Sequence, residues 1–371
     1  MQIARLETLF VKPRWVFLKM ETDEGLVGWG EPVVEGWSRT TAMAVEEMGR
    51  YLLGKDPRRI EHHWQALYRG AFYRGGPVLC SALSGLEQAM WDIKGKALGV
   101  PVHELLGGAV RDRIRVYAHV GGRDVDAYAA SGARRLEEGF TALKTSPFAA
   151  VRFVESPAFV DAAVARVAAL REAVGEGVDI GIDFHGRVSL PMAVRLAHAL
   201  EPLHPLFIEE PCLPENVDAL VRVARATSIP VATGERLFTR WGFRRVLEQG
   251  AAAILQPDVS HAGGILETRK IAALAETYYA ALAPHCPLGP IALAACLQVD
   301  ACTPNFLCQE QVCLGAGYLT EPFVVRDGHV AVPGAPGLGI EVDEEALPAL
   351  TCDGSYENPR LWHGDGSLAD W

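Results

Sequence analysis

The chain has 371 residues, of which 49% are hydrophobic, and it carries a formal net charge of −11 at pH 7. This charge excludes nucleic acid as an expected partner, because binding it requires a basic face that neutralises phosphates. No apolar run is long enough to cross a bilayer and the first residues lack the pattern of a secretory signal, so we expect a cytoplasmic protein without a membrane partner.

The cysteines support the same compartment. The sequence contains eight of them and no C-x-x-C pair. Cys302, Cys308 and Cys313 are spaced for neither a zinc site nor a disulfide framework, so we expect reduced thiols.

Residues 1–110 predict an α+β domain that precedes the main body of the chain. Two strands, 16–22 and 26–31, flank a tight turn at Asp23-Glu24-Gly25. Apolar residues at three- and four-residue spacing then predict helices near 38–53, 59–70 and 78–97.

Residues 111–320 alternate short apolar runs with helical stretches. The runs, which we interpret as strands one to eight, end at residues 119, 144, 183, 209, 235, 258, 285 and 310. Helical periodicity covers 124–138, 156–174, 190–202, 215–228, 239–250, 263–278 and 289–305. This order predicts an α/β fold, a (β/α)₈ barrel of the TIM type, whose chemistry sits at the carboxyl ends of the strands.

Residues 321–371 return to strand and turn character, with the run FVVRDGHVAVPGAPGLGIEVDE at their start. We expect this C-terminal segment to pack back on the first domain and to complete it as a cap over the barrel. The chain is long enough for two hydrophobic cores.

Three acidic residues lie at equal steps along the predicted barrel. Asp183, Glu209 and Glu235 are 26 residues apart and close strands three, four and five. Adjacent strands bring the three carboxylates together, and such a cluster needs a cation to stay ionised. Oxygen ligands favour Mg²⁺ over zinc, so we expect one Mg²⁺ per subunit. The alternative, three unrelated helix caps, fits one such residue better than three at matched strand ends.

Two histidines are expected on opposite sides of this cluster. His185 lies two residues after Asp183, so on an extended strand it faces the same way. His285 ends strand seven, diametrically opposite strand three, and Asp258 on strand six is placed to orient it as a base. Glu310 ends strand eight beside them. The remaining histidines, including His261, are interpreted as structural.

Together these features resemble the mandelate racemase subgroup of the enolase superfamily, and the likeness extends over nearly the whole chain. The runs that carry it are PRWVFLKMETDEGLVGWGEPVVEG, FYRGGP, DFHGR, LFIEEP, GERLFTR, ILQPDVSHAGGI, APHCPLGPIALAACLQVD and PGLGIEVDE. Within that subgroup they are most similar to the dehydratases of D-galactonate.

The resemblance implies a carbon–oxygen lyase that converts D-galactonate to 2-dehydro-3-deoxy-D-galactonate and water. Asp183, Glu209 and Glu235 would hold Mg²⁺ for the sugar-acid carboxylate. His285, oriented by Asp258, would remove the C2 proton, and a protonated Glu310 would stabilise the intermediate by hydrogen bonding. His185 would protonate the departing 3-hydroxyl. The resemblance also implies a homo-oligomer, possibly an octamer.

One departure from the subgroup favours elimination over racemisation. Many members carry a second lysine two residues after the strand-two lysine, where it acts as a base. Here Lys144 is followed by Thr145 and Ser146, so that base is absent. The adjoining stretch 145–156 matches the galactonate enzymes least well, which leaves the substrate less well defined than the reaction.

Loops of the first domain are expected to read the far end of the substrate. The PRW run at 13–15 would present Arg14 or Trp15 to the polyol chain, and a solvated hairpin position is equally open for Arg14. The stretch 73–76 is a weaker candidate, since its glycines also suit a simple turn.

Other functions remain alternatives. A zinc amidohydrolase fits poorly, because its first strand carries His-x-His where this one ends in a single His119. A non-catalytic binding protein of the same fold is disfavoured by intact candidates for every role. Dehydration of another aldonate, such as gluconate, is the nearest alternative, and a racemase or cycloisomerase is more remote.

Overall fold

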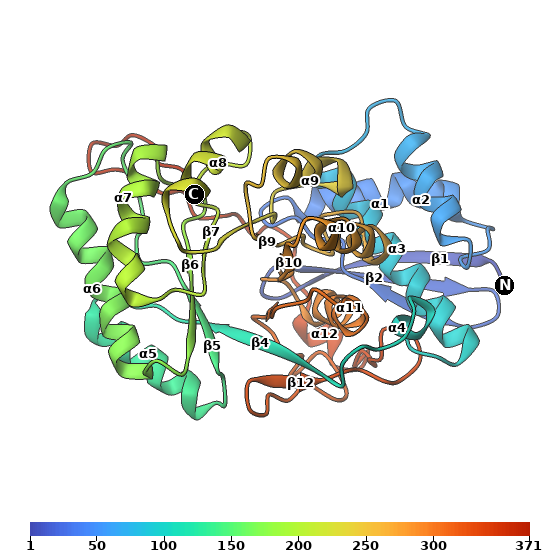
Figure 1. Ribbon diagram of the computed structural model, residues 1–371. Helices are drawn as coiled ribbons and strands as arrows, with labels where there is room; N and C mark the ends of the chain where they lie inside the picture. Colours follow the sequence, from blue (N-terminus) through green and yellow to red (C-terminus); the bar gives the residue numbers. More distant parts are fainter.

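A computed structural model describes residues 1–371 as two packed parts, a capping domain and a barrel (Figure 1). The eight cysteines form no disulfide. None of the helices combines the length and the apolar character that a membrane span requires.

The capping domain begins with an antiparallel sheet in the order β1 (Ile3–Val11), β2 (Trp15–Thr22), β3 (Val27–Gly30). Its helices are α1 (Ser38–Leu52), α2 (Ile60–Arg69), α3 (Gly76–Leu98) and the short α4 (Val102–Leu105). Helix α3 lies directly on β3 because Gly30 has no side chain: a Cβ there would stand 2.0 Å from the carbonyl oxygen of Gly85. The three predicted helices are confirmed within a few residues.

The barrel is built from eight parallel strands, and seven helices connect them (Figure 1). The strands are β4 (Arg113–His119), β5 (Ala142–Thr145), β6 (Asp179–Asp183), β7 (Phe207–Glu209), β8 (Val231–Thr233), β9 (Ile254–Leu255), β10 (Ala281–Leu282) and β11 (Gln309–Glu310). The helices are α5 (Val125–Glu137), α6 (Pro157–Val174), α7 (Leu190–Leu200), α8 (Val217–Ala226), α9 (Thr239–Glu248), α10 (Ile265–Thr277) and α11 (Pro290–Ala301). A 3₁₀ turn, η1 (Glu201–Leu203), follows α7.

The ring closes where the last strand meets the first. β11 pairs in parallel with β4, and a bridge between Leu282 and Phe306 joins β10 to the segment that leads into β11. The predicted barrel is thus confirmed, with shorter strands: β8, β9 and β10 end two to three residues before Glu235, Asp258 and His285. Those three side chains project from the loops that follow the strands.

The interior of the barrel is filled by side chains. Tyr117, Phe207, Ile254 and Cys308 form one buried cluster with neighbouring alanines. Gly181 leaves room for Phe207, because a Cβ on Gly181 would stand 2.5 Å from its ring. A plugged interior confines access by substrate to the carboxyl ends of the strands.

The segment after β11 touches both parts of the molecule. β12 (His329–Ala331) pairs antiparallel with β4, and α12 (Leu347–Leu350) leads to a bridge between Thr351 and Val11 of β1. The remaining residues then cross to the barrel (Figure 1), where Trp371 lies against the loop that follows β6. The expected return to the capping domain is thus followed by a second crossing that the sequence did not predict.

Candidate active site

The three predicted carboxylates meet at the barrel mouth. Asp183 ends β6 and Glu209 ends β7, and the two residues are direct partners in the parallel ladder. Glu235 follows β8 after Gly234, whose φ of 146° favours glycine. One carboxylate oxygen from each of the three residues lies within 4.8 Å of the others. The equal spacing in the sequence therefore corresponds to one cluster in space.

Charge crowding in this cluster suits a hard cation. Burial, reinforced by Asp183, raises the pKa of Glu209 well above its usual range. Burial, with Glu210 close by, raises the pKa of Glu235 to about 7. The pKa of Asp183 is lowered instead, because Lys144 and His185 outweigh the effect of its burial. Two buried carboxylates and a third, Glu235, that is partly exposed, with this excess of negative charge, fit a divalent cation of the Mg²⁺ class.

Lys144 is central to the site, and the sequence reasoning used it only as a marker for a missing second lysine. Its Nζ lies 2.9 Å from Glu209 Oε1, 2.8 Å from Glu310 Oε1 and 3.3 Å from Asp183 Oδ2. Its side chain is buried, yet its pKa is raised well above normal, since Glu209 and Glu310 outweigh the cost of burial. The available signal was its position: a lysine at the end of an apolar strand faces the same mouth as the carboxylates.

His285 and Asp258 form the expected pair. The distance from His285 Nδ1 to Asp258 Oδ2 is 2.8 Å, and the backbone N–H of Ser260 donates to the other oxygen of Asp258 at 2.7 Å. This arrangement fixes the imidazole and leaves Nε2 facing Glu235 and Glu310, at 3.5 Å and 3.8 Å. Burial lowers the pKa of His285, but Glu310, Glu235 and Asp258 outweigh it and raise the pKa well above normal. A cation on Glu235 would offset part of that effect.

Glu310 is surrounded by donors. Its Oε1 accepts from His119 Nε2 at 2.7 Å and from Lys144, and its Oε2 accepts from the backbone N–H of Cys286 at 2.8 Å. Burial raises the pKa of Glu310, but Lys144, His285 and His119 together hold it well below the usual range. Without substrate these donors favour the ionised form of Glu310, and the protonated form that the resemblance implies for the substrate complex stays a prediction. His119 is a further site residue that the sequence reasoning considered only as a failed zinc ligand.

His185 lies beside Asp183, as predicted, but for a different reason. Strand β6 ends at Asp183, and His185 has a φ of 51° in the loop beyond, so the extended-strand argument was wrong. Its backbone N–H donates to Asp183 Oδ1 at 3.0 Å, and its carbonyl accepts from Arg236 Nη2 at 3.1 Å. These bonds hold His185 in a left-handed backbone conformation, which costs free energy for a residue other than glycine and persists only when the surrounding structure stabilises it.

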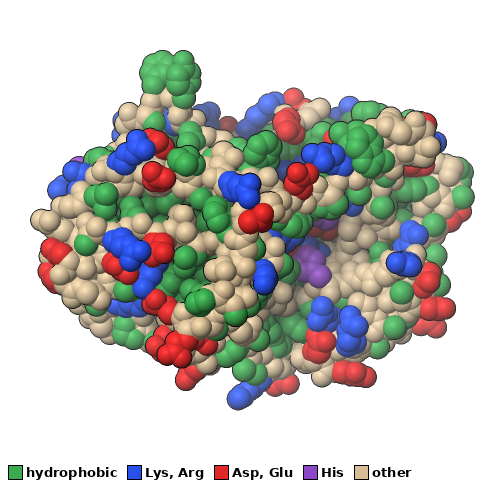
Figure 2. All heavy atoms as spheres, turned by 180° about the vertical axis from the view of Figure 1, so that it is seen from behind, with side chains coloured by type: hydrophobic (Ala, Val, Ile, Leu, Met, Phe, Trp, Pro, Cys, Tyr) green, Lys and Arg blue, Asp and Glu red, His purple; other side chains and the backbone are tan.

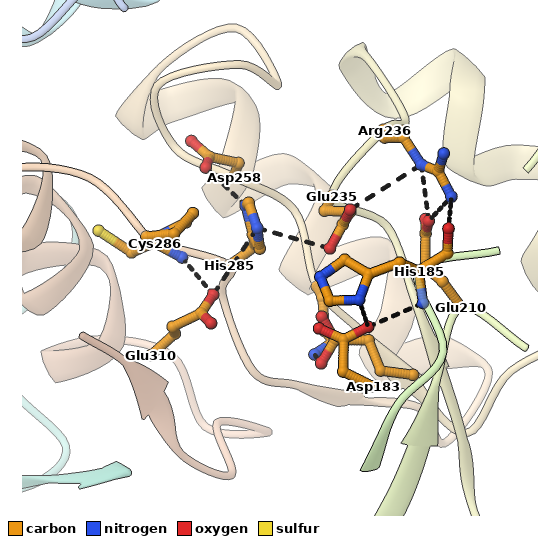
Figure 3. A network of polar contacts seen from close by, with 12 residues as sticks. Asp183, His185, Glu210, Glu235, Arg236, Asp258, His285, Cys286 and Glu310 are labelled. Carbon is orange, nitrogen blue, oxygen red and sulfur yellow. Dashed lines mark hydrogen bonds and ion pairs between the residues drawn. The ribbon is translucent and has the colours of Figure 1, made fainter. Parts of the chain in front are cut away.

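The two histidines face the carboxylates from different directions. β6 and β10 are four strands apart in the ring of eight. In Figure 3, Glu235 lies between His285 and His185, while Asp258 and Glu310 lie on the His285 side. Figure 2 shows histidine side chains on the floor of a hollow between the two halves of the molecule. A substrate above the carboxylates would thus meet an imidazole on each side.

Of the two predicted residues in the capping loop, Arg14 is the one that reaches the barrel. Arg14 Nη2 donates to the carbonyl oxygen of Pro287, two residues after His285, at 3.0 Å and pairs with Glu35 at 2.7 Å. Trp15 is 3% exposed in the hydrophobic core, and its ring lies 5.3 Å from the Arg14 guanidinium. Trp15 therefore supports Arg14 from below.

The stretch 73–76 and the histidines interpreted as structural lie outside the cluster of Asp183, Glu209 and Glu235. Of the stretch 73–76, the first three residues lie in the loop between α2 and α3, which projects from the top of the molecule in Figure 1, and Gly76 begins α3; Tyr73 is 85% exposed. His261 bonds through Nδ1 to Ser81 Oγ of α3 at 2.7 Å and lies 3.6 Å from Asp258. It therefore ties the Asp258 loop to the capping domain. His63 and His103 likewise hydrogen-bond within the fold.

Comparison with known families covers both parts of the chain. Residues 127–346 match the enolase C-terminal domain-like family, and residues 3–107 match the N-terminal domain of the mandelate racemase / muconate lactonizing enzyme family. Both matches cover the elements that carry or cap the carboxylate cluster.

Several full-length relatives are named D-galactonate dehydratase. The chain is 54% identical to D-galactonate dehydratase of Variovorax paradoxus and 53% identical to D-galactonate dehydratase of Ralstonia nicotianae, each over 100% of both chains. Among solved structures, a putative galactarate dehydratase from Agrobacterium radiobacter, with bound Na and L-malate, is 34% identical over 100% of both chains with a TM-score of 0.93. A putative mandelate racemase/muconate lactonizing enzyme from Labrenzia alexandrii is 37% identical, with a TM-score of 0.90, over 98% of this chain and 99% of its own.

Proposed function

The chain belongs to the mandelate racemase / muconate lactonizing enzyme family of the enolase superfamily, and on that premise we propose that it is a Mg²⁺-dependent dehydratase that converts D-galactonate to 2-dehydro-3-deoxy-D-galactonate and water. Its full-length likeness to D-galactonate dehydratases makes it a hydro-lyase that acts on acid sugars. The metal, the substrate and the roles of individual residues are our proposal.

The observation that carries the proposal is the pair of histidines across one carboxylate cluster. An elimination in which a proton leaves C2 and a hydroxyl leaves C3 needs a base near the first carbon and an acid near the second. His285 has a carboxylate partner that orients it, and His185 lies on the other side of Glu235 (Figure 3). This asymmetry suits one base and one acid better than two equivalent bases.

Asp183, Glu209 and Glu235 would hold the cation. When bound, Mg²⁺ would supply positive charge next to the substrate carboxylate, where negative charge develops as the C2 proton leaves. Lys144 adds a second, permanent positive charge to the same group of oxygens. Because Lys144 is buried and paired with three carboxylates, it is not available as a free base.

His285 Nε2 removes the C2 proton in the proposed first step. Asp258 accepts from Nδ1, which keeps the lone pair of Nε2 directed toward the mouth and stabilises the imidazolium that forms. The electron pair of the broken C2–H bond delocalises toward the substrate carboxylate. Glu310 would help orient that end of the substrate through Lys144 and His119, which it holds in place.

The second step expels the 3-hydroxyl. The electron pair at C2 forms the C2=C3 bond, the C3–O bond breaks, and His185 gives the oxygen a proton so that it leaves as water. The resulting enol tautomerises to the 2-keto-3-deoxy acid. By the resemblance to the subgroup, Ser146 stands where many members carry a second lysine, which disfavours racemisation between two opposed bases.

The identity of the sugar acid depends on the loops around the mouth. We propose that Arg14 contributes to the end of the site remote from C1, since it bridges the capping domain and the loop after His285. Trp15 would keep the guanidinium in place by packing beneath it.

A screen of acid sugars for 2-keto product, with Mg²⁺ and after its removal, tests the proposal directly. We expect D-galactonate to be the best substrate and activity to require the cation. A protein that turns over no acid sugar with Mg²⁺ present would contradict the proposed function. A protein that prefers another aldonate would keep the reaction and change the substrate.

A further inference from the structure

Residues 352–371 link the capping domain to the barrel mouth. At the capping end, the backbone N–H of Cys352 donates to Phe10 at 3.0 Å, and Asn358 Nδ2 donates to the carbonyl oxygen of Glu35 at 3.2 Å. The chain then forms a small hairpin, in which Ala369 donates to Leu361 at 2.9 Å. It ends on the barrel side of the molecule (Figure 1), at the loop that follows β6. This segment therefore connects the two parts across the mouth.

The residue that this segment brings to the mouth is Trp371. Its ring meets the His185 imidazole edge to face, with centroids 5.5 Å apart and an interplanar angle of 87°. The guanidinium of Arg187 lies 5.4 Å from the same ring and is itself held by the carbonyl oxygen of Phe148 at 3.1 Å. Edge-to-face geometry is the favourable arrangement for aromatic rings. Trp371 therefore contacts a proposed catalytic side chain from more than 180 residues away in the sequence.

The His185 ring needs such a neighbour. Hydrogen bonds to Asp183 and Arg236 fix its backbone, but its imidazole makes none within the protein. Nδ1 lies 3.2 Å from Asp183 Oδ1 outside hydrogen-bond geometry, so Nε2 is the nitrogen left to face a substrate. His285, by contrast, is oriented by a hydrogen bond at 2.8 Å. The edge-to-face contact with Trp371 is thus a packing contact that limits rotation of the His185 ring.

We propose that Trp371 is a positioning residue for His185, holding the imidazole so that Nε2 is directed at the departing 3-hydroxyl. The inference rests on the proposed function, because it assigns Trp371 to the second step of that elimination. Trp371 acts through His185. The indole also lies near the guanidinium of Arg187, which donates to the carbonyl oxygen of Phe148 in the 145–156 loop.

The test compares Trp371→Ala, Trp371→Phe and a matched control, Trp362→Ala, which removes an exposed indole from the same hairpin. For each purified protein with Mg²⁺, kcat and KM are measured on D-galactonate. Deuterium at C2 of the recovered substrate is measured after partial turnover in D₂O. Thermal melting shows that each variant is folded.

We expect Trp371→Ala to lower kcat about tenfold with little change in KM, because a misdirected acid slows the chemical step and leaves binding intact. Deuterium in recovered substrate should rise, since His285 still removes the C2 proton while the hydroxyl leaves slowly. Trp371→Phe should regain most of the lost kcat, because a smaller ring keeps the edge-to-face contact. Trp362→Ala should behave as the unmodified protein does.

Three results would overturn the inference. These are an unchanged kcat in Trp371→Ala, a parallel fall of exchange and dehydration, and an equal loss in Trp362→Ala. Failure of the proposed function is distinguishable, because the unmodified protein then does not dehydrate D-galactonate. In that case, kcat, KM and deuterium at C2 of recovered substrate are measured on the acid sugar that the protein does dehydrate. If no acid sugar is dehydrated, the inference falls with the function.

Discussion

The two sides of the barrel mouth are built differently. On the His285 side, Asp258 and Glu310 are each about 1% exposed, and each is held by a backbone N–H group as well as by side chains. On the His185 side, a residue with positive φ carries an imidazole without a hydrogen bond, and the nearby loop exposes 82% of Phe153. The difference suggests a division of labour. In the proposed reaction, the C2 proton is removed on the side where buried groups are held by hydrogen bonds, while departure of the hydroxyl depends on loops with exposed side chains.

The largest effect is expected where the two sides share the carboxylate cluster. Glu209→Gln removes a charge that pairs with Lys144 and would bind the cation. We expect metal binding to be lost and turnover to fall by about 10³-fold or more, because the cation that stabilises the developing negative charge is then missing. EDTA should abolish the activity of the unmodified protein, and Mg²⁺ or Mn²⁺ should restore it. Full activity of a rigorously metal-free preparation would contradict this assignment.

The next largest effect is expected on the His285 side of the mouth. His285→Asn removes the proposed base while keeping a group of similar polarity beside Asp258. Exchange of the C2 proton with solvent deuterium and dehydration should both fall, by about 10²- to 10⁴-fold, because both begin with that proton transfer. The measurement is deuterium content at C2 by NMR alongside 2-keto product formation. Preserved exchange in this variant would assign the base elsewhere.

Removing the acid on the loop side should have a smaller and different effect. His185→Asn is expected to slow loss of the 3-hydroxyl by about 10²-fold and to leave C2 exchange measurable, because His285 is intact. The same two measurements apply, so each variant is the other's control. If His185→Asn alone prevented exchange while His285→Asn preserved it, the roles would be reversed.

The sequence predicted the His285 side of the mouth better than the His185 side, for a physical reason. Strand order fixes where the ends of β6 to β11 meet, so Asp183, Glu209 and the His285–Asp258 pair could be placed from spacing alone. His185 was placed correctly by a wrong argument, because the turn after β6 depends on hydrogen bonds to Glu210 and Arg236 that no periodicity encodes.

Two contacts were beyond the reach of sequence reasoning. The hydrogen bonds that Glu310 accepts from Lys144 and His119 join residues on different strands, and only the fold brings these residues together. Trp371 meets His185 only because residues 352–371 cross the mouth. Local periodicity reports which face of an element is buried, and it carries no information on contacts between remote loops.

The smallest expected effect concerns the choice between two sugar acids, and it tests whether loops read the substrate. In the proposed reaction the cation and the two histidines act on C1 to C3, so D-galactonate and D-gluconate, which differ at C4, present the same atoms to them. Discrimination must then come from side chains of loops such as Arg14. One hydrogen bond gained or lost changes kcat/KM by roughly tenfold, so we expect a preference for D-galactonate of at least about that size. Comparable kcat/KM values, or a preference for D-gluconate, would leave the elimination intact but reject D-galactonate as the substrate. The poorly matched loop at 145–156 would then be the first region to exchange with that of a relative, because it borders the mouth on the His185 side and its Phe148 carbonyl holds Arg187 beneath Trp371.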